Sequence, residues 1–140
     1  MSMDGLGRVF NVVAAASGVH IPLTNYAAIS FVSFLDAGTQ SFTLKESKAG
    51  NNEQNLAVID HLYKGPGVGG TWTKVTQAAA ATFDLTTDAT NDCVVFTVRN
   101  EQLSDGFNAV ELTAGTGIVV AILHDLKIMR DPTLLLKSAV

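Results

Sequence analysis

Two adjacent pairs of residues carry side chains that often bind metal ions. Asp60 precedes His61 and His124 precedes Asp125, while His20 stands apart. Imidazole nitrogens and carboxylate oxygens are ligands for zinc and related ions. A strand points adjacent side chains to opposite faces, so neither pair is expected to reach one ion. The i, i+4 ligand spacing is also missing around His61 and His124. We therefore expect no metal site, and we expect these histidines to be solvated or hydrogen-bonded at strand ends.

Catalytic motifs are missing as well. No serine lies in a G-x-S-x-G turn, which exposes the nucleophile of many hydrolases. Glycoside hydrolysis needs two carboxyl groups at a set separation, and no spacing singles out two of the aspartates. Asp36, Asp88 and Asp92 do not have the spacing of a calcium loop. The serines and the other aspartates that we considered are Ser17, Ser33, Ser104, Ser138, Asp84 and Asp105. We interpret all of them as residues of turns, strands or the tail, and we expect no enzyme.

A glycine-rich segment, 65–70, has the sequence GPGVGG and satisfies the dinucleotide-binding pattern G-x-G-x-x-G. That pattern binds a pyrophosphate only where a helix follows it. Here the alternating segment 71–76 follows, which indicates a strand, and Pro66 has no backbone N–H to donate. We expect a flexible loop and no cofactor.

The single tryptophan and the single cysteine are expected to be structural. Trp72 lies near Lys64 and Lys74, which is a thin basis for a sugar or nucleic-acid platform, so we expect it in the core. Cys93 begins the apolar run CVVF and has no neighbouring cation to lower its pKa, which predicts a small buried residue. One cysteine excludes an internal disulfide and a cysteine-rich zinc site.

The composition narrows the class of protein. The chain has 140 residues, 47% hydrophobic and 16% charged, with a net charge of −4. Such a chain has enough apolar surface to fold as one domain and is not disordered. The negative charge argues against a protein that coats nucleic acid. Because so few charged groups solvate the surface, we expect part of it to be covered by a partner.

Neither a membrane helix nor a secretion signal is expected near the N-terminus. No charged residue occurs between Arg8 and Asp36, but polar residues and Pro22 interrupt this stretch before it could span a bilayer. A signal peptide is disfavoured by Asp4 in the position of the basic region and by Asn11 in the apolar segment.

The hydrophobic pattern has a period of two along most of the chain, which predicts strands. Segment 27–35 places Ile29 and Phe31 on one face and Val32 and Phe34 on the other, as in a strand buried on both sides or at an interface. Further alternating segments are 39–47, 71–76, 82–86, 92–99, 107–113 and 118–123. Roughly eight or nine strands, about 8–12 residues apart, predict an all-β sandwich or barrel.

One segment leaves its secondary structure open. Within 54–63, the pairs Val58/Leu62 and Ile59/Tyr63 have helical spacing, whereas the β-branched and aromatic content is typical of a strand. We favour the strand.

We expect one β-sandwich domain over residues 1–140, with its core at about 21–130 and extended arms at 1–20 and 131–140. The C-terminal arm holds the consecutive leucines Leu134, Leu135 and Leu136. Such an apolar run at a terminus requires a groove or a partner.

Several short strand and turn segments resemble those of a known family. They are FTLKE (42–46), NLAVID (55–60), GGTWTK (69–74), LSDGF (103–107), LHDL (123–126) and RDP (130–132). Over about 27–132 the chain resembles small virion proteins of tailed bacteriophages. It is most similar to the jelly-roll cement proteins that decorate HK97-fold heads.

The resemblance implies a jelly-roll-like antiparallel β-sandwich, no catalysis, and binding to the outer surface of a phage capsid. There the protein would stabilise contacts between major capsid protein subunits, on virions assembled from protein made in the host cytoplasm. Self-association is expected, with a dimer favoured and a trimer as the alternative; nucleic acid and membranes are not expected partners. We expect the arms to supply the capsid or oligomer interface, through Phe10, Arg130, Asp131, Pro132, Leu134, Leu135 and Leu136.

Two other classes of protein are weighed against this one. A tail-tube, tail-terminator or neck protein is also all-β and driven by assembly. A carbohydrate-binding β-sandwich module would use aromatic side chains, for which Trp72 and Tyr26 are the candidates.

Overall fold

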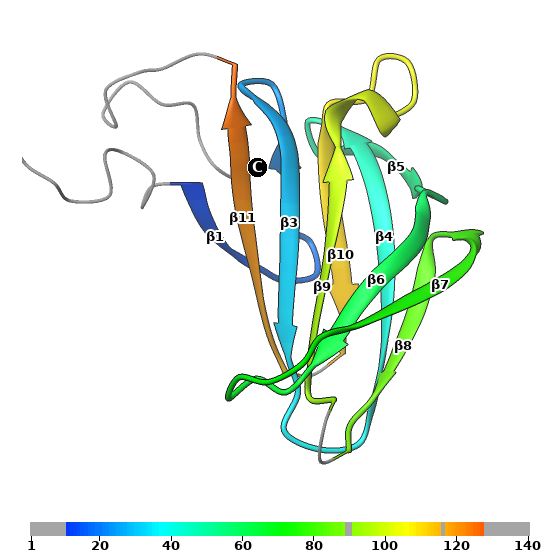
Figure 1. The fold of residues 1–140 in the computed structure, drawn as a ribbon. Coiled ribbons are helices and arrows are strands. Elements are labelled where there is room, and N and C mark those ends of the chain that lie inside the picture. The colour runs from blue at the N-terminus through cyan, green and yellow to red at the C-terminus, as the bar shows by residue number, and fades with distance from the viewer. Residues whose placement is uncertain (1–10, 89–90, 116, 128–140) are drawn as a thin grey trace, which may run out of the picture.

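The computed structural model describes residues 11–88, 91–115 and 117–127 (Figure 1). In these residues the chain folds almost entirely as strands, with one turn of 3-10 helix at Asn100–Gln102. No described helix is long and apolar enough to cross a membrane. The strands are β1 (Val12–Ala15), β2 (Ile21–Pro22), β3 (Tyr26–Phe34), β4 (Thr39–Lys48), β5 (Asn51–Asn55), β6 (Ile59–Gly65), β7 (Thr73–Ala80), β8 (Thr82–Thr86), β9 (Cys93–Arg99), β10 (Ala109–Ala114) and β11 (Ile118–Leu126).

The strands form two antiparallel sheets (Figure 1). The six-stranded sheet has the order β1-β11-β3-β9-β6-β7. The five-stranded sheet has the path β2-β10-β4-β5, and β8 also pairs with β4. The period of the sequence predicted a sandwich or a barrel, and the resemblance implied an antiparallel sandwich; the all-β antiparallel sandwich is confirmed.

Strands that are distant in the chain pair in a nested order. β3 pairs with β11, β4 with β10, and β6 with β9. The two halves of the chain therefore run side by side as one long antiparallel hairpin, which is folded into the two sheets. This nesting makes the sandwich jelly-roll-like.

The alternation of side chains along β3 shows how the sequence builds the layers. Ile29 and Phe31 are buried, whereas Phe34 lies on the outer face and is exposed. Phe31 stacks on Phe96 of β9, with ring centroids 5.2 Å apart. Burying a side chain of this size stabilises a fold by roughly 1.5–3 kcal/mol. The sandwich is thus held together by the inward half of each alternating pattern.

Residues 54–63 contain the end of β5 and the start of β6, so the strand favoured from the sequence is confirmed. The pairing of β6 with β7 shifts register between Ile59 and His61. Ile59 and Leu62 are both buried although they are three residues apart. The irregularity in the strand therefore lets Ile59 and Leu62 both face the core, whereas Tyr63, which has helical spacing from Ile59, is exposed.

The N-terminal boundary of the sandwich differs from the expected one. Val12–Ala15, placed in the arm by the sequence analysis, pairs with β11 as an edge strand of the six-stranded sheet. Val13 is buried in the core. The sandwich thus begins before residue 21, because this short segment has apolar residues that complete the sheet.

The expected interface in the arms lies outside the described residues. This applies to Phe10, Arg130, Asp131, Pro132, Leu134, Leu135 and Leu136. Their part in any interface stays a prediction.

Candidate interaction surface

The register of the six-stranded sheet brings apolar side chains together on its outer face. Ile118 of β11 lies opposite Phe34 of β3, which lies opposite Cys93 of β9. Directly opposed residues have Cβ atoms about 4.5–5.5 Å apart, so their side chains pack against one another. This row joins three strands that are far apart in the chain.

A second apolar row runs beside the first. It crosses the sheet from Ala14 through Val120, Val32 and Val95 to Tyr63. Val120, Val32 and Val95 each lie two positions along their strand from the first-row residues Ile118, Phe34 and Cys93. Side chains two positions apart in a strand point to the same face, so both rows face outward. The outer face therefore carries a continuous apolar area rather than scattered apolar residues.

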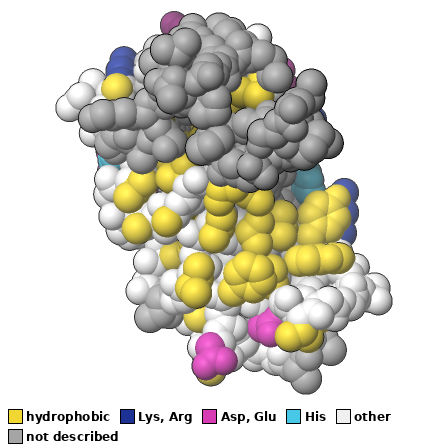
Figure 2. Space-filling model, turned by 90° about the vertical axis from the view of Figure 1, so that its left-hand side faces the viewer, with side chains coloured by type: hydrophobic (Ala, Val, Ile, Leu, Met, Phe, Trp, Pro, Cys, Tyr) yellow, Lys and Arg dark blue, Asp and Glu magenta, His cyan; other side chains and the backbone are white. Residues whose placement is uncertain are grey.

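We call this area the apolar patch. Its most exposed members have solvent-exposed fractions of 67% for Ile118, 50% for Val12 and 47% for Trp72. Figure 2 shows hydrophobic side chains gathered on this side of the molecule. Such contiguous exposed surface is typical of sites that bind another macromolecule. The apolar patch comprises Val12, Val32, Phe34, Tyr63, Trp72, Val95, Ile118, Val120 and Ile122.

Trp72 belongs to this surface, and the expectation that it lies in the core is wrong. Its exposed fraction is 47%, and it lines a shallow hollow with Tyr63 and Val95. The ring covers Gly65, where an added Cβ would lie 2.9 Å from Trp72 Cε3. Gly65 therefore lets the indole lie flat against β6, just beyond the end of the core.

The proposed carbohydrate platform of Trp72 and Tyr26 is not formed. Tyr26 is buried, and its hydroxyl donates a hydrogen bond of 3.0 Å to Asn11 Oδ1. Burial raises the pKa of this phenol. An aromatic ring enclosed in this way cannot stack on a sugar.

The other end of the same outer face is polar. Ser30 Oγ lies 2.8 Å from His124 Nε2 and 2.7 Å from Thr97 Oγ1. His124 Nδ1 lies 3.1 Å from Asp125 Oδ2. A serine, a histidine and an aspartate thus stand in the order of a hydrolase triad. Local sequence pattern does not indicate Ser30, because the residues that meet it lie 67 and 94 positions away in the chain.

The surroundings of Ser30 do not favour nucleophilic catalysis. Acyl transfer needs donors that stabilise an oxyanion, usually backbone N–H groups that are free to point at it. Ser30 lies in β3, which is flanked on both sides by β11 and β9. The amide groups of such a central strand are used in the two ladders. We interpret the Ser30 group as a hydrogen-bonded surface network.

A cleft lies beside this network, between β6 and the end of β9. It has a volume of about 430 Å³, and His61, Thr97, Arg99 and His124 contribute to its lining. β6 pairs with β9 only from Tyr63 to Gly65, so the two strands separate beyond Tyr63 and leave this space. The cleft is the polar counterpart of the apolar patch on the same sheet.

Asp60 and His61 interact, contrary to the expectation from strand alternation. His61 Nδ1 lies 2.6 Å from Asp60 Oδ1. The register shift beside them disturbs the regular alternation of β6. The hydrogen bond from His61 lowers the pKa of Asp60. Both side chains are exposed, as expected for a histidine near a strand end.

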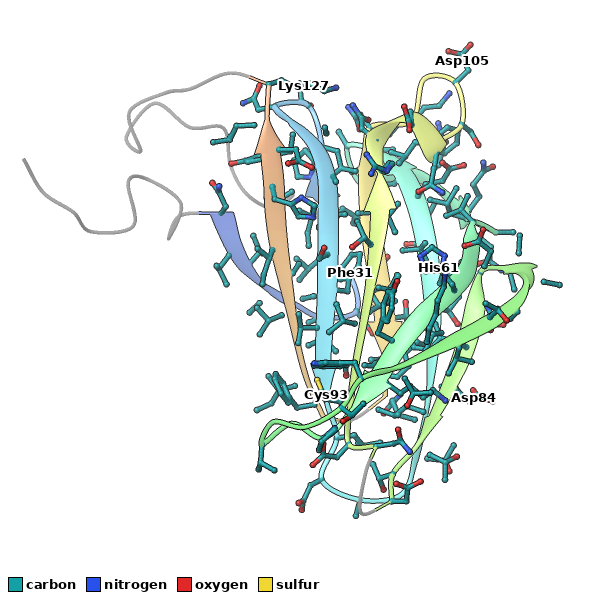
Figure 3. The ribbon with its side chains drawn as sticks, viewed as in Figure 1. Phe31, His61, Asp84, Cys93, Asp105 and Lys127 are labelled. Carbon is teal, nitrogen blue, oxygen red and sulfur yellow. The ribbon has the colours of Figure 1, made fainter. Side chains whose placement is uncertain are left out.

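Cys93 is buried in the first apolar row, as predicted (Figure 3). Burial, followed by the charge of Asp92, raises the pKa of its thiol. The thiol therefore stays protonated near neutral pH, which suits packing rather than chemistry.

Two of the aspartates considered for acid–base chemistry lie far apart. Figure 3 shows Asp84 and Asp105 at opposite ends of the sandwich. Asp84 accepts a hydrogen bond of 2.6 Å from Ser41 Oγ, and Asp92 accepts one from the amide of Gly67. These two carboxylates hold neighbouring strands and a loop in place.

The comparisons with known proteins give no relative. No protein-family model matches the chain, and neither a curated protein nor a solved structure matches it.

Proposed function

We propose that this protein is a non-enzymatic structural protein of a tailed-phage virion, which binds the outer surface of the capsid and stabilises contacts between major capsid protein subunits. The observation that carries the proposal is the apolar patch. A rigid sandwich presents all of it except Trp72 on strands, and Trp72 rests on Gly65 of β6, so its shape is fixed before binding.

The chemistry of the patch favours a protein partner. The outward positions of β9 run from Cys93 and Val95 to Thr97 and Arg99, so a charge is reached only at the far end of the strand. Large aromatic and branched side chains without charge are typical of the buried centre of a protein interface. Trp72 and Phe34 would supply the aromatic anchors.

The repeated geometry of a capsid suits a patch of this kind. Several half-exposed side chains give modest affinity at one site, and repetition over a lattice of identical subunits raises the total. The resemblance of the strand and turn segments to cement proteins selects the capsid among possible lattices. Self-association, with a dimer favoured, is part of the same proposal and is measured by analytical ultracentrifugation.

The test is the composition of virions produced by the genome that encodes the chain. We expect the protein in purified particles at a copy number near that of the major capsid protein, as measured by quantitative mass spectrometry. A few to a few tens of copies would instead indicate a neck or tail protein. Absence from the particles would overturn the proposal.

A further inference from the structure

The five-stranded sheet brings charged side chains together on its outer face. Lys45 of β4 lies opposite Glu111 of β10, and Ser47 lies opposite Ala109. The segment between β1 and β2 crosses over this face, where the amide of Gly18 donates a hydrogen bond of 2.6 Å to Glu111 Oε1. The crossing buries both Ser47 and Glu111 although they point away from the core.

The same crossing segment places His20 between two carboxyl groups. His20 Nε2 lies 3.6 Å from Glu53 Oε2 and 3.6 Å from Glu111 Oε2. The three potential ligand atoms all lie within 4.8 Å of one another. Among the described residues, these three side chains form the one group of three or more potential ligands close enough to share an ion.

Glu111 supplies an independent observation. Its exposed fraction is 2%, and its Oε2 atom is buried without a hydrogen-bond partner. Leaving a buried carboxylate oxygen unpaired is costly, because the group has lost its hydration. That oxygen faces His20 and Glu53, so the missing interaction would come from whatever lies between these three side chains.

Glu46 shows what a satisfied buried carboxylate looks like in the same sheet. Its Oε1 accepts hydrogen bonds from Gln54 and from the Ser104 hydroxyl, and its Oε2 accepts one of 2.8 Å from the Ser104 amide. Both oxygens are therefore paired within the protein. The unpaired oxygen of Glu111 is thus a property of its own site rather than of buried glutamates in this fold.

His20 is held in position through its other ring nitrogen. Nδ1 lies 3.0 Å from Ser47 Oγ, and that oxygen also accepts a hydrogen bond of 3.1 Å from the Gly50 amide. Ligating histidines are commonly fixed by such a contact on the nitrogen that does not bind the metal. With the proton on Nδ1, the lone pair of Nε2 faces the two carboxyl groups.

Glu53 is held as a carboxylate beside the same point. Its Oε1 accepts a hydrogen bond from the Lys45 ammonium. This bond orients the Glu53 carboxylate, whose other oxygen, Oε2, lies 3.6 Å from His20 Nε2.

We propose that His20, Glu53 and Glu111 bind one divalent transition-metal ion of the zinc type. Ligand atoms about 2.0–2.2 Å from a tetrahedral zinc ion are separated by about 3.4 Å. The two separations of 3.6 Å in the protein are close to this value. Three protein ligands leave the fourth position to water.

The ligand set distinguishes between classes of metal. An imidazole nitrogen with two carboxylate oxygens suits zinc and neighbouring transition metals. Calcium takes 6–8 oxygen ligands, and magnesium keeps most of its water. The ion would join the crossing segment to β5 and β10, and so fix the connection between β1 of the six-stranded sheet and β2 to the five-stranded sheet.

The test uses the full chain, freed of metal with EDTA and dialysed, and zinc chloride as the probe. We expect calorimetry to show one equivalent of zinc bound with micromolar affinity, and zinc to raise the midpoint of thermal unfolding. Glu111→Gln and Glu53→Gln should each weaken binding at least tenfold. His61→Gln is the matched control, because it removes an exposed histidine next to a carboxylate, and it should bind like the wild type.

Each outcome decides the proposal. The proposal is overturned if the wild type binds no zinc, or if Glu53→Gln binds zinc as strongly as the wild type. It is also overturned if millimolar calcium displaces the zinc. Glu53 is partly exposed, so its replacement tests the site even if a variant of the buried Glu111 does not fold. In the wild type, zinc should also shift the imidazole NMR signals of His20 more than those of His61 and His124; the reverse order would contradict the assignment.

Discussion

The two outer faces of the sandwich follow the same alternation but present opposite chemistry. On the six-stranded sheet, Phe34 and Ile118 point outward and stay exposed. On the five-stranded sheet, Ser47 and Glu111 also point outward, but the segment between β1 and β2 covers them. One face is thus apolar and open, and the other is polar and partly closed.

The difference shows what each kind of group requires. An exposed apolar side chain loses little by remaining in water, and it gains when a partner covers it. A carboxylate that the fold has covered must have donors or a positive charge close by. The open face is therefore suited to a partner that covers it from outside, and the closed face to an ion held within the chain.

The largest expected effect is on binding through the open face. The double variant Phe34→Asp, Ile118→Asp should weaken binding to capsids assembled without the chain by on the order of 100-fold or more. Each replacement removes roughly 1.5–3 kcal/mol of apolar burial, and about 1.4 kcal/mol corresponds to tenfold in affinity. The measurement is cosedimentation with the capsids.

The matched control adds the same two charges to the five-stranded sheet. Asn51 and Asn55 are exposed in β5, so Asn51→Asp with Asn55→Asp should bind within a few-fold of the wild type. Equal loss of binding in both double variants would show that charge, rather than the apolar patch, controls the interaction.

A smaller effect is expected on the free energy of unfolding, which should respond differently to replacement of Glu46 in the core and of Glu111 on the closed face. In buffer with EDTA, Glu46→Gln should lower the free energy of unfolding by about 1–3 kcal/mol, because it replaces an oxygen that accepts hydrogen bonds with a donor. Glu111→Gln should cost less than about 1 kcal/mol, since its paired oxygen can be kept. Urea denaturation measures both values, and the opposite order would contradict the contrast.

Alkaline pH should slightly lower the free energy of unfolding, because Cys93 beneath the open face ionises less readily in the folded protein than in the unfolded chain. The folded-state pKa of this thiol is raised by burial. Its contribution is therefore complete below the unfolded pKa of about 8.5 and is lost as the pH rises through the folded pKa. We expect about 1 kcal/mol or less between pH 7 and pH 9.5, below the range in which Tyr26 titrates.

The control for this pH dependence is Cys93→Ala. Its own loss of packing is present at both pH values, so only the difference between pH 7 and pH 9.5 is compared. That difference should be smaller in the variant than in the wild type; an unchanged difference would assign the alkaline loss to other groups.

The smallest expected effect concerns the polar end of the open face. Ser30→Ala removes the hydroxyl between His124 and Thr97 and should cost about 0.5–1 kcal/mol in urea denaturation, as for a partly exposed hydrogen bond. A fluorophosphonate probe, which labels activated serines, should leave the wild type unmodified. Stoichiometric labelling at Ser30 would make this group a catalytic site and would contradict the proposed function.

Local pattern was enough to predict the strands. The alternation in 27–35 gave both the buried Ile29 and Phe31 and the outward Val32 and Phe34, because side-chain direction in a strand follows position alone. Cys93 was predicted to be buried because it begins an apolar run and has no neighbouring cation, and it is buried although it lies in an outward row. Trp72 was predicted wrongly, since it lies just before β7 begins and rests on Gly65 rather than between the sheets.

The candidate sites could not be predicted in this way. His20, Glu53 and Glu111 come from a crossing segment, β5 and β10, and no two of them have a recognisable spacing in the sequence. The Ser30 network depends on which strands flank β3. Asp60 meets His61 beside a register shift, which the local pattern does not predict.

The sequence by itself determined that this chain is all-β and, in strands such as β3, which residues face inward, because a period of two is a local property of the backbone. Only the tertiary structure decided which outward residues meet. Gly18 and Glu111 are 93 positions apart, yet they are joined by a hydrogen bond. Contacts at that separation depend on strand order, register and the path of one crossing segment, and none of these is encoded in the neighbourhood of either residue.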